Sequence, residues 1–207
     1  MNGKFITFEG CEGSGKSTQI RLLSERLSKE GVKHIVTREP GGSEIAEQIR
    51  KIILSGKNTA MTDECEALLY AAARAQHLSE KVAPALAEGT LVLCDRFVDS
   101  SLAYQGYARG LDMQFIEGIN SFALKNFMPD VTLFLNISPE DAFKRKHGAD
   151  KDDRMEQLGL GFHQKVYEGY LALAEKYPQR IVKVDCGGNK WQTAEVIYNI
   201  LKQHKII

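Results

Sequence analysis

The sequence predicts an α/β protein built on a parallel sheet. Short apolar runs alternate with longer amphipathic segments along the 207 residues. The apolar runs are continuous rather than interleaved with polar residues, which is typical of strands buried on both faces of a sheet. Helices between successive strands imply right-handed βαβ crossovers, which make the strands parallel. We therefore expect one parallel sheet flanked by helices.

Five short runs fit the strand pattern, and most of them are rich in Val, Ile, Leu or Phe. A sheet of five parallel strands is expected from them. The runs are residues 4–9 (KFITFE), 34–37 (HIVT), 91–94 (LVLC), 131–137 (VTLFLNI) and 181–185 (IVKVD).

The segments between these strands have the apolar spacing that an amphipathic helix requires. They are long enough to cross back over the sheet and start the next parallel strand. The predicted helices are residues 17–29, 44–54, 63–87, 112–126, 141–147, 154–176 and 190–202.

Ligands of such sheets bind outside the carboxyl ends of the strands. The loops that follow the predicted strands are therefore the places to search for a site. They are residues 9–17, 38–43 and 95–104, and the loops after Ile137 and Asp185.

The loop after the first strand carries the strongest signal. Its sequence GCEGSGKS, residues 10–17, matches GxxxxGK[ST] and lies between a predicted strand and a predicted helix, as that pattern requires. Glycines let backbone N–H groups turn toward phosphate oxygens, and the helix N-terminus adds partial positive charge. Lys16 is expected to reach the β and γ phosphates, and the Ser17 hydroxyl to bind Mg²⁺. The expected nucleotide contacts are Gly10, Cys11, Glu12, Gly13, Ser14, Gly15, Lys16, Ser17 and Thr18.

The third predicted strand ends in an acid followed by an arginine. Asp95 is expected near the Mg²⁺, because an apolar strand ending in a carboxylate forms the second half of such nucleotide sites. Arg96 then lies at the same edge of the sheet, where it can grip a second phosphate bidentately. The pair favours a phosphotransferase with a second substrate site.

Other nucleotide-binding classes fit less well. Residues 185–188 (DCGG) match the DxxG pattern of GTPases, but residues 189–192 (NKWQ) lack the final Asp of the guanine motif and follow immediately. A motor or a large ATPase normally needs a longer chain. A small kinase is the class that remains.

Composition indicates which partners and which cellular compartment fit the protein. The chain has 27 Lys plus Arg and 27 Asp plus Glu, so its net charge is zero, which disfavours general electrostatic binding to nucleic acid. No apolar run approaches the roughly 20 residues of a membrane span, and the apolar stretch in residues 1–8 is too short for a signal peptide. The four cysteines show no metal-binding spacing, which favours reduced thiols in a cytoplasmic protein. Cys11 lies in the phosphate loop, so a block of that loop by thiol modification is a hypothesis from position alone.

Several segments resemble the thymidylate kinases of bacterial type, a family of P-loop nucleoside monophosphate kinases, in the family's order along nearly the whole chain. This resemblance implies a P-loop kinase fold with a five-stranded parallel sheet and a short lid, in one domain of residues 1–207. It also implies the reaction of ATP and dTMP to ADP and dTDP with Mg²⁺, in a homodimer. The matching segments are residues 8–18 (FEGCEGSGKST), 37–50 (TREPGGSEIAEQIR), 68–77 (LLYAAARAQH), 95–106 (DRFVDSSLAYQG) and 153–157 (DRMEQ).

The resemblance also implies which residues read the thymine base. Tyr70 is expected to stack on the ring, and Arg74, four residues later on the same helix face, to donate to the thymine O4. Ser101 and Gln105 resemble the polar pair that faces the N3 edge. Tyr104 resembles the residue beside the sugar 2′ position, where it disfavours a ribose hydroxyl.

Four further residues and one proline are assigned by the same resemblance. Arg50 and Arg96 are expected to clamp the phosphate of dTMP. Glu12 and Glu39 resemble acids near the sugar 3′-OH and the metal. Pro40 resembles part of the wall near the thymine methyl group.

The catalytic cation is expected in the lid. Some relatives carry an arginine within the phosphate loop, but Gly13 occupies that position here. The lid candidate is residues 144–154 (KRKHGADKDDR), and its possible cations are Lys144, Arg145, Lys146, Lys151 and Arg154. Among them, the resemblance implies that Arg145 stacks on adenine and that Arg154 contacts the phosphates. Lys16, Asp95, Arg96 and Arg154 are thus the expected catalytic residues.

Two alternatives stay open at this point. A kinase for another nucleoside monophosphate or a deoxynucleoside would keep residues 10–17 but need another base edge than Arg74, Ser101 and Gln105 provide. A non-enzymatic module would bind ATP without turnover, although such a module has no evident need for the pair Asp95 and Arg96.

Overall fold

The computed structural model describes residues 3–146 and 153–207 and contains a five-stranded, all-parallel sheet. The order across the sheet is β2-β3-β1-β4-β5. This confirms the predicted fold class and all five strands, with ends that differ by at most one residue. The strands are β1 (Phe5–Glu9), β2 (His34–Arg38), β3 (Leu91–Asp95), β4 (Val131–Asn136) and β5 (Ile181–Asp185).

Burial along the strands follows the sheet order. Every residue of the central strand β1 is buried, whereas the edge strands β2 and β5 each keep exposed positions. This is why the central strands appear in the sequence as continuous apolar runs. Even the one polar side chain in the middle of β1, Thr7, is satisfied internally by Thr132 of β4, at 2.8 Å between the hydroxyl oxygens.

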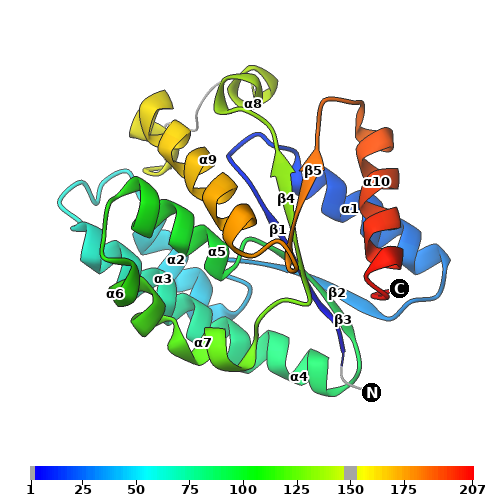
Figure 1. The fold of residues 1–207 in the computed structure, drawn as a ribbon. Coiled ribbons are helices and arrows are strands. Elements are labelled where there is room, and N and C mark those ends of the chain that lie inside the picture. Colours follow the sequence, from blue (N-terminus) through cyan, green and yellow to red (C-terminus); the bar gives the residue numbers. More distant parts are fainter. Residues whose placement is uncertain (1–2, 147–152) are drawn as a thin grey trace.

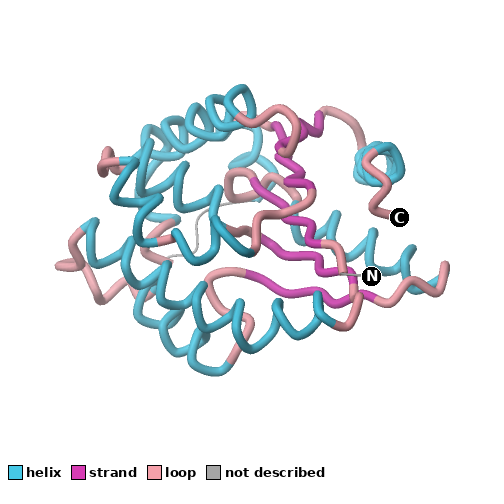
Figure 2. Tube along the Cα trace, turned by 60° about the horizontal axis from the view of Figure 1, so that its bottom comes forward, coloured by secondary structure: helices cyan, strands magenta, loops and turns pink. Residues whose placement is uncertain are grey.

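Helices cover both faces of the sheet (Figure 1; Figure 2). Two of them, α1 and α10, lie together on one face, and the others that pack on the sheet lie on the opposite face. The helical segments are α1 (Lys16–Lys29), α2 (Glu44–Leu54), α3 (Asp63–His77), η1 (Leu78–Val82), α4 (Ala83–Ala87), α5 (Val98–Ser101), η2 (Leu102–Ala108), α6 (Met113–Ile119), α7 (Ser121–Asn126), α8 (Pro139–Lys146), η3 (Glu156–Leu158), α9 (Gly159–Lys176) and α10 (Lys190–Gln203).

The two faces of the sheet carry separate apolar cores. On the side of α1 and α10, side chains such as Phe8 and Leu27 are fully buried with Leu201 of α10. On the other side, Phe134 of β4 packs with Tyr170 of α9, with ring centroids 5.2 Å apart. This contact holds α9 against β4, near the carboxyl end of that strand.

Three helix predictions needed correction. The predicted helix 63–87 contains a π-helical turn, η1, before α4, which begins next to Pro84, a residue without an N–H to donate. The predicted helix 112–126 is divided at Asn120, which ends α6. The predicted helix 154–176 begins at Gly159, which has a φ of 74° and separates it from η3.

One helical segment was not predicted. Residues 98–108 form α5 and the π-helical η2, although residues 95–104 were expected to be a loop. All but one of these eleven residues are buried, so no polar face alternates with an apolar one and the amphipathic signal is missing.

The fold brings the carboxyl ends of β1, β2 and β3 to one edge, as predicted. The phosphate loop follows β1, Glu39 follows β2, and Asp95 ends β3. Among the described helices, none is long and apolar enough to cross a membrane.

Candidate active site

The phosphate loop has the backbone geometry of an anion site. Gly10 has a φ of 140°, and a Cβ at that position would lie 2.9 Å from the carbonyl oxygen of Leu135. Gly15 caps α1 without any side-chain hydrogen bond, so the first amides of the helix stay available to an anion. Lys16 is buried and donates to the carbonyl oxygens of Gly10 and Cys11, both at 3.1 Å. Burial lowers the pKa of Lys16, and the nearby charge of Arg96 lowers it further.

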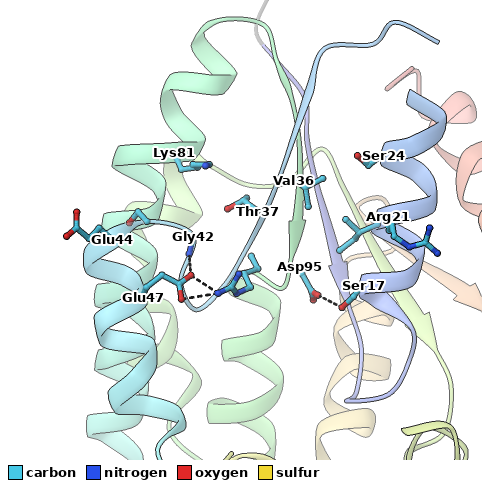
Figure 3. Close-up of a pocket in the computed structure, with 13 residues that line it drawn as sticks. Ser17, Arg21, Ser24, Val36, Thr37, Gly42, Glu44, Glu47, Lys81 and Asp95 are labelled. Atoms are coloured by element: carbon cyan, nitrogen blue, oxygen red, sulfur yellow. Dashed lines mark hydrogen bonds and ion pairs between the residues drawn. The ribbon is translucent and has the colours of Figure 1, made fainter. Parts of the chain in front are cut away.

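Ser17 and Asp95 fit a divalent cation. The Ser17 hydroxyl lies 3.3 Å from Oδ2 of Asp95, and Figure 3 shows the two side chains pointing toward each other. The other oxygen of Asp95, Oδ1, is buried and has no hydrogen-bond partner in the described part of the chain. An unpaired carboxylate oxygen beside a hydroxyl is the donor set that Mg²⁺ prefers.

A groove runs from this pair along β2, between α1 and α2 (Figure 3). Two of the charged side chains that line this groove already pair with each other. Arg38 donates to both carboxylate oxygens of Glu47 at 2.8 and 2.9 Å, and the Gly42 amide donates to the same carboxylate. Apart from Ser17 and Asp95, none of the residues predicted for the site lines the groove.

A second pocket lies beside the phosphate loop. All residues predicted to bind the second substrate line it, except Arg74 and Ser101. Its lining is Glu12, Glu39, Pro40, Arg50, Leu54, Tyr70, Arg96, Ser100, Tyr104, Gln105, Asp153 and Met155.

The second pocket and the cavity over the phosphate loop share four lining residues: Glu12, Glu39, Arg50 and Arg96. Two arginines therefore stand where the two cavities meet. Arg50 is held there by a hydrogen bond from Nη1 to the carbonyl oxygen of Pro40, at 2.9 Å. A phosphate placed at this junction would lie next to the loop that holds another phosphate.

Arg96 is the most constrained of these residues. Its backbone has a φ of 68°, a left-handed conformation that is uncommon for arginine. Nη2 donates to Glu12 at 2.5 Å, while Nη1 donates to the hydroxyls of Ser100 and Tyr170, each at 3.3 Å. Strained backbone of this kind concentrates at functional sites.

Behind Arg96 lies a carboxylate that sequence reasoning missed. Glu9, the last residue of β1, is fully buried and accepts from the Phe97 amide at 2.7 Å and from the hydroxyls of Ser100 and Tyr170 at 2.6 and 2.7 Å. Burial raises the pKa of Glu9 to about 7, and the charge of Asp99 adds to the rise. Glu9 is the first residue of segment 9–17, which the sequence analysis gave as a place to search for a site. No sequence pattern distinguishes Tyr170 from other aromatic residues.

Arg74 and Ser101 are joined to each other outside the pocket lining. Nη1 of Arg74 donates to the Ser101 hydroxyl at 3.0 Å and to Asn120 at 2.5 Å. Nε donates to Glu39 at 2.7 Å, and Nη2 to the carbonyl oxygen of Phe97 at 3.1 Å. The guanidinium is 1% exposed, and these bonds leave one further N–H on Nη2 for a ligand.

Gln105 and Arg154 meet at another buried acid that was not predicted. Glu66 is fully buried and accepts from Gln105 Nε2 at 2.8 Å, from Arg109 Nη2 at 2.8 Å and from Arg154. Arg154 also donates to the carbonyl oxygen of Ile53 at 3.1 Å. Arg154 thus lies against α2 and α3 and does not line the phosphate cavity. Residues 147–152 of the expected lid lie outside the described residues.

The far side of the phosphate loop opens onto another cavity. Arg145 lines it and donates to the carbonyl oxygen of Cys186 at 2.9 Å. Residues after β5 that were not assigned also contribute, although the loop after Asp185 was a predicted place to search. The lining is Gly13, Ser14, Gly15, Thr18, Gln19, Arg145, Cys186, Gly188, Lys190 and Thr193.

A phosphate loop whose cavity continues into a second pocket with its own arginines defines a P-loop kinase that acts on a phosphate-bearing acceptor. The family model described as thymidylate kinase matches residues 8–197. The chain belongs to the thymidylate kinase family: it is a phosphotransferase that converts dTMP to dTDP, with ATP as phosphoryl donor.

Individual relatives agree with this family. The chain is 53% identical over 192 residues to a thymidylate kinase of Bacillus velezensis, which covers 92% of this chain and 91% of the relative. It is 51% identical over 213 residues to a thymidylate kinase of Bacillus pumilus, with full coverage of both chains. The crystal structure of a thymidylate kinase from Ehrlichia chaffeensis is similar with a TM-score of 0.76 and 29% identity, over 97% of this chain and 100% of that one.

Proposed function

We propose that dTMP binds in the second pocket with its phosphate at the junction of the two cavities, in line with the γ-phosphate of ATP on the loop. The observation that carries this assignment is the position of Arg96, which lines both cavities and is fixed by contacts at both terminal nitrogens. Phosphoryl transfer requires alignment and neutralisation of charge rather than covalent chemistry from the protein. Arg50 and Arg96 supply that alignment for the acceptor phosphate.

The proposed base contacts follow from hydrogen-bond valence. Gln105 gives its amide N–H to Glu66, so its carbonyl oxygen is the group left to accept the N3–H of thymine. The remaining Nη2 N–H of Arg74 is the donor proposed for thymine O4. Tyr70 and Tyr104 line the pocket and supply the aromatic surface for the base and the sugar. Glu12, Glu39 and Pro40 form the wall toward the sugar and the thymine methyl group.

The donor side is assigned to the loop and its surroundings. Ser17 and Asp95 are the residues proposed to hold Mg²⁺, which when bound neutralises phosphate charge. Lys16 is proposed to bind the β and γ phosphates, and Arg145 to flank the adenine in its cavity. Arg154 stays a prediction as the catalytic cation, since it contacts Glu66 here.

A homodimer is proposed from the exposed face of α2 and α3. Ile45 and Ile52 of α2 and Leu68 of α3 are each about half exposed, at 48%, 48% and 50%. The two helices pack on each other, and we propose that these apolar side chains meet the same side chains of a second copy across a two-fold axis. We also propose that the enzyme acts in the cytoplasm as a single domain with a short lid, without a membrane or nucleic-acid partner.

The test is a coupled ADP-release assay with ATP and Mg²⁺ across dTMP, dUMP, dCMP, dGMP, dAMP and thymidine. We expect dTMP to be preferred over dUMP by about 10–200-fold, the range for one methyl group in an apolar pocket. Cytosine would place an amino group against the donor of Arg74, so dCMP should be rejected more strongly. Preference for another acceptor would show that the base pocket is assigned wrongly, and ATP binding without turnover would indicate a binding module.

A further inference from the structure

We propose that Tyr170 is a positioning residue for phosphoryl transfer: together with Glu9 and Ser100, its hydroxyl holds the Arg96 guanidinium in the orientation that receives the phosphate of dTMP. This inference rests on the proposed role of Arg96 in the phosphate clamp. Tyr170 does not line either cavity, so its hydroxyl would act through Arg96 rather than on the substrate directly. Its ring also meets that of Tyr104, with centroids 6.4 Å apart, and a Tyr170→Phe variant keeps that ring contact.

The contacts form a closed set. Nη1 of Arg96 donates to the hydroxyl oxygens of Tyr170 and Ser100, each at 3.3 Å. Both hydroxyls donate in turn to Oε2 of Glu9, at 2.7 and 2.6 Å. The two hydroxyl oxygens are themselves 2.9 Å apart. One oxygen of Glu9 therefore accepts from both hydroxyls, and both hydroxyl oxygens accept from the same nitrogen of Arg96.

The two hydroxyls can accept from Arg96 because their own protons are donated to Glu9. When Glu9 is ionised, each hydroxyl donates its one proton to the carboxylate, so only the hydroxyl lone pairs are left to face Arg96. Glu9 thus makes both hydroxyls acceptors, which is the role that a guanidinium requires of its partners. Replacing Tyr170 by Phe removes one acceptor and leaves the other.

The guanidinium is held from two sides. Ser100 of α5 and Tyr170 of α9 bind Nη1, whereas Glu12 of the phosphate loop binds Nη2. A planar fork fixed at both nitrogens has one orientation, and a bidentate contact to phosphate depends on that orientation. Without the Nη1 contacts, the charged end of Arg96 would keep Glu12 and the ring of Tyr104, whose centroid lies 5.1 Å from Cζ, and neither of them binds Nη1.

Tyr170 is rigid enough for this task. It is 1% exposed, and its ring stacks on Phe134 of β4 with an interplanar angle of 21°. The hydroxyl position is therefore fixed by the sheet itself. A side chain locked by packing is what precise positioning of a binding group requires.

The decisive variant is Tyr170→Phe, which keeps the ring and removes the hydroxyl. We would measure the Kd of dTMP and of thymidine by calorimetry, together with KM and kcat. Loss of one hydrogen bond to a charged group predicts about tenfold weaker binding of dTMP. Thymidine has no phosphate for Arg96 to hold, so its Kd should stay within a factor of about two. A merely structural role would weaken both ligands alike.

Tyr167→Phe is the matched control. Tyr167 lies on the same helix, its ring also packs on Phe134 with centroids 6.1 Å apart, and its hydroxyl donates to Asn136 at 2.9 Å. This variant should bind dTMP and thymidine as the unmodified enzyme does. Ser100→Ala, which removes the other acceptor, should give the same selective loss of dTMP binding and serves if Tyr170→Phe does not fold.

Arg96→Lys separates this inference from the proposed clamp. If Arg96→Lys leaves the preference for dTMP over thymidine intact, Arg96 is not part of the clamp and the proposed function of the site fails. If Arg96→Lys reduces the preference while Tyr170→Phe and Ser100→Ala do not, only the positioning role is overturned. Equal weakening of dTMP and thymidine by Tyr170→Phe would also overturn it.

Discussion

Gln105 donates its side-chain amide to the fully buried carboxylate of Glu66, with 2.8 Å between Nε2 and Oε1. This contact fixes which end of the Gln105 amide faces the pocket, because a carboxylate can only accept. Glu66, which does not line the pocket, thereby determines that Gln105 presents an acceptor rather than a donor to the base.

Glu66→Gln should therefore weaken base selection. A glutamine at this position can donate to Gln105 as well as accept, so the Gln105 amide can turn its N–H groups toward the base. We expect the ratio of kcat/KM for dTMP to that for dCMP to fall by about tenfold, the value of one buried hydrogen bond. Glu64→Gln, an exposed change on the same helix, should leave the ratio unchanged. An unaltered ratio in Glu66→Gln would contradict the proposed role of Gln105.

The same substitution should lower stability. Glu66 accepts from the guanidinium groups of Arg109 and Arg154, which are 14% and 12% exposed. Removal of the charge takes from Arg154 the carboxylate that it contacts, whereas Arg109 keeps its ion pair with Asp63 at 3.2 Å. Breaking a buried ion pair costs about 3–5 kcal/mol. Denaturant unfolding of Glu66→Gln beside Glu64→Gln measures the difference. Equal free energies of unfolding would show that the arginines find other partners.

Glu9 predicts a pH dependence of stability. Its pKa is raised to about 7 by burial and by Asp99, against the opposing charge of Arg96 and the hydrogen bonds from Ser100 and Tyr170. Between the unfolded pKa of 4.5 and about 7 the native state binds more protons than the unfolded state, so stability falls as pH rises through this range. The shift corresponds to about 3 kcal/mol in the native state.

Glu9→Gln should lack this contribution to the pH dependence of stability, because a glutamine side chain does not titrate. The free energy of unfolding of the unmodified protein, relative to that of Glu9→Gln, should decrease by about 2.5 kcal/mol between pH 5 and pH 8, because the unfolded-state pKa of 4.5 places a small part of the change below pH 5. Urea unfolding at both pH values measures the two differences, and the comparison cancels the titration of all other groups. Parallel pH profiles for the two proteins would show that Glu9 titrates near its ordinary pKa.

The phosphate-loop thiol should be unreactive. Cys11 is 2% exposed, and burial raises its pKa to about 11, although Lys16 and Arg96 act in the opposite direction. In a Cys65→Ser variant the remaining cysteines are all buried, so an aromatic disulfide reagent at pH 8 should modify the native protein slowly and the unfolded protein at once. Rapid loss of ATP binding in that variant would revive the hypothesis that thiol modification blocks the loop.

Gly10 should not tolerate a side chain. A Cβ there would lie 2.9 Å from the Leu135 carbonyl oxygen, at a φ of 140° that L-residues rarely adopt. Gly10→Ala should lose ATP binding at least tenfold in a calorimetric titration, since the loop would have to move away from β4. Gly118→Ala in α6, where no atom lies within 4 Å of the added Cβ, should instead stabilise the fold by about 0.5–1 kcal/mol.

The sheet and the phosphate loop could be predicted from the sequence because their signals are local. A buried parallel strand needs a continuous apolar run, and the loop needs its glycines and Lys16 at fixed spacing. Asp95 follows from the end of its strand. The residues around the second pocket came from a resemblance, and the structure gathers most of them there.

The buried acids and Tyr170 could not be predicted in the same way. Glu66 follows Asp63 and Glu64 at the start of α3, where acidic residues are common on exposed surfaces. Its burial depends on Gln105 and Arg154, which lie far along the chain. Tyr170 resembles any core aromatic of an amphipathic helix until Arg96 is placed beside it.

Arg74 bears on how this enzyme could be retargeted to another base. Its guanidinium joins Glu39, Ser101, Asn120 and the Phe97 carbonyl, so it ties together segments that follow β2 and β3 and the break between α6 and α7. A substitution there would disrupt the scaffold before it altered selectivity. Engineering of a new nucleobase preference should therefore begin at Gln105, for which the described part of the chain shows one side-chain hydrogen bond, to Glu66, against four for Arg74.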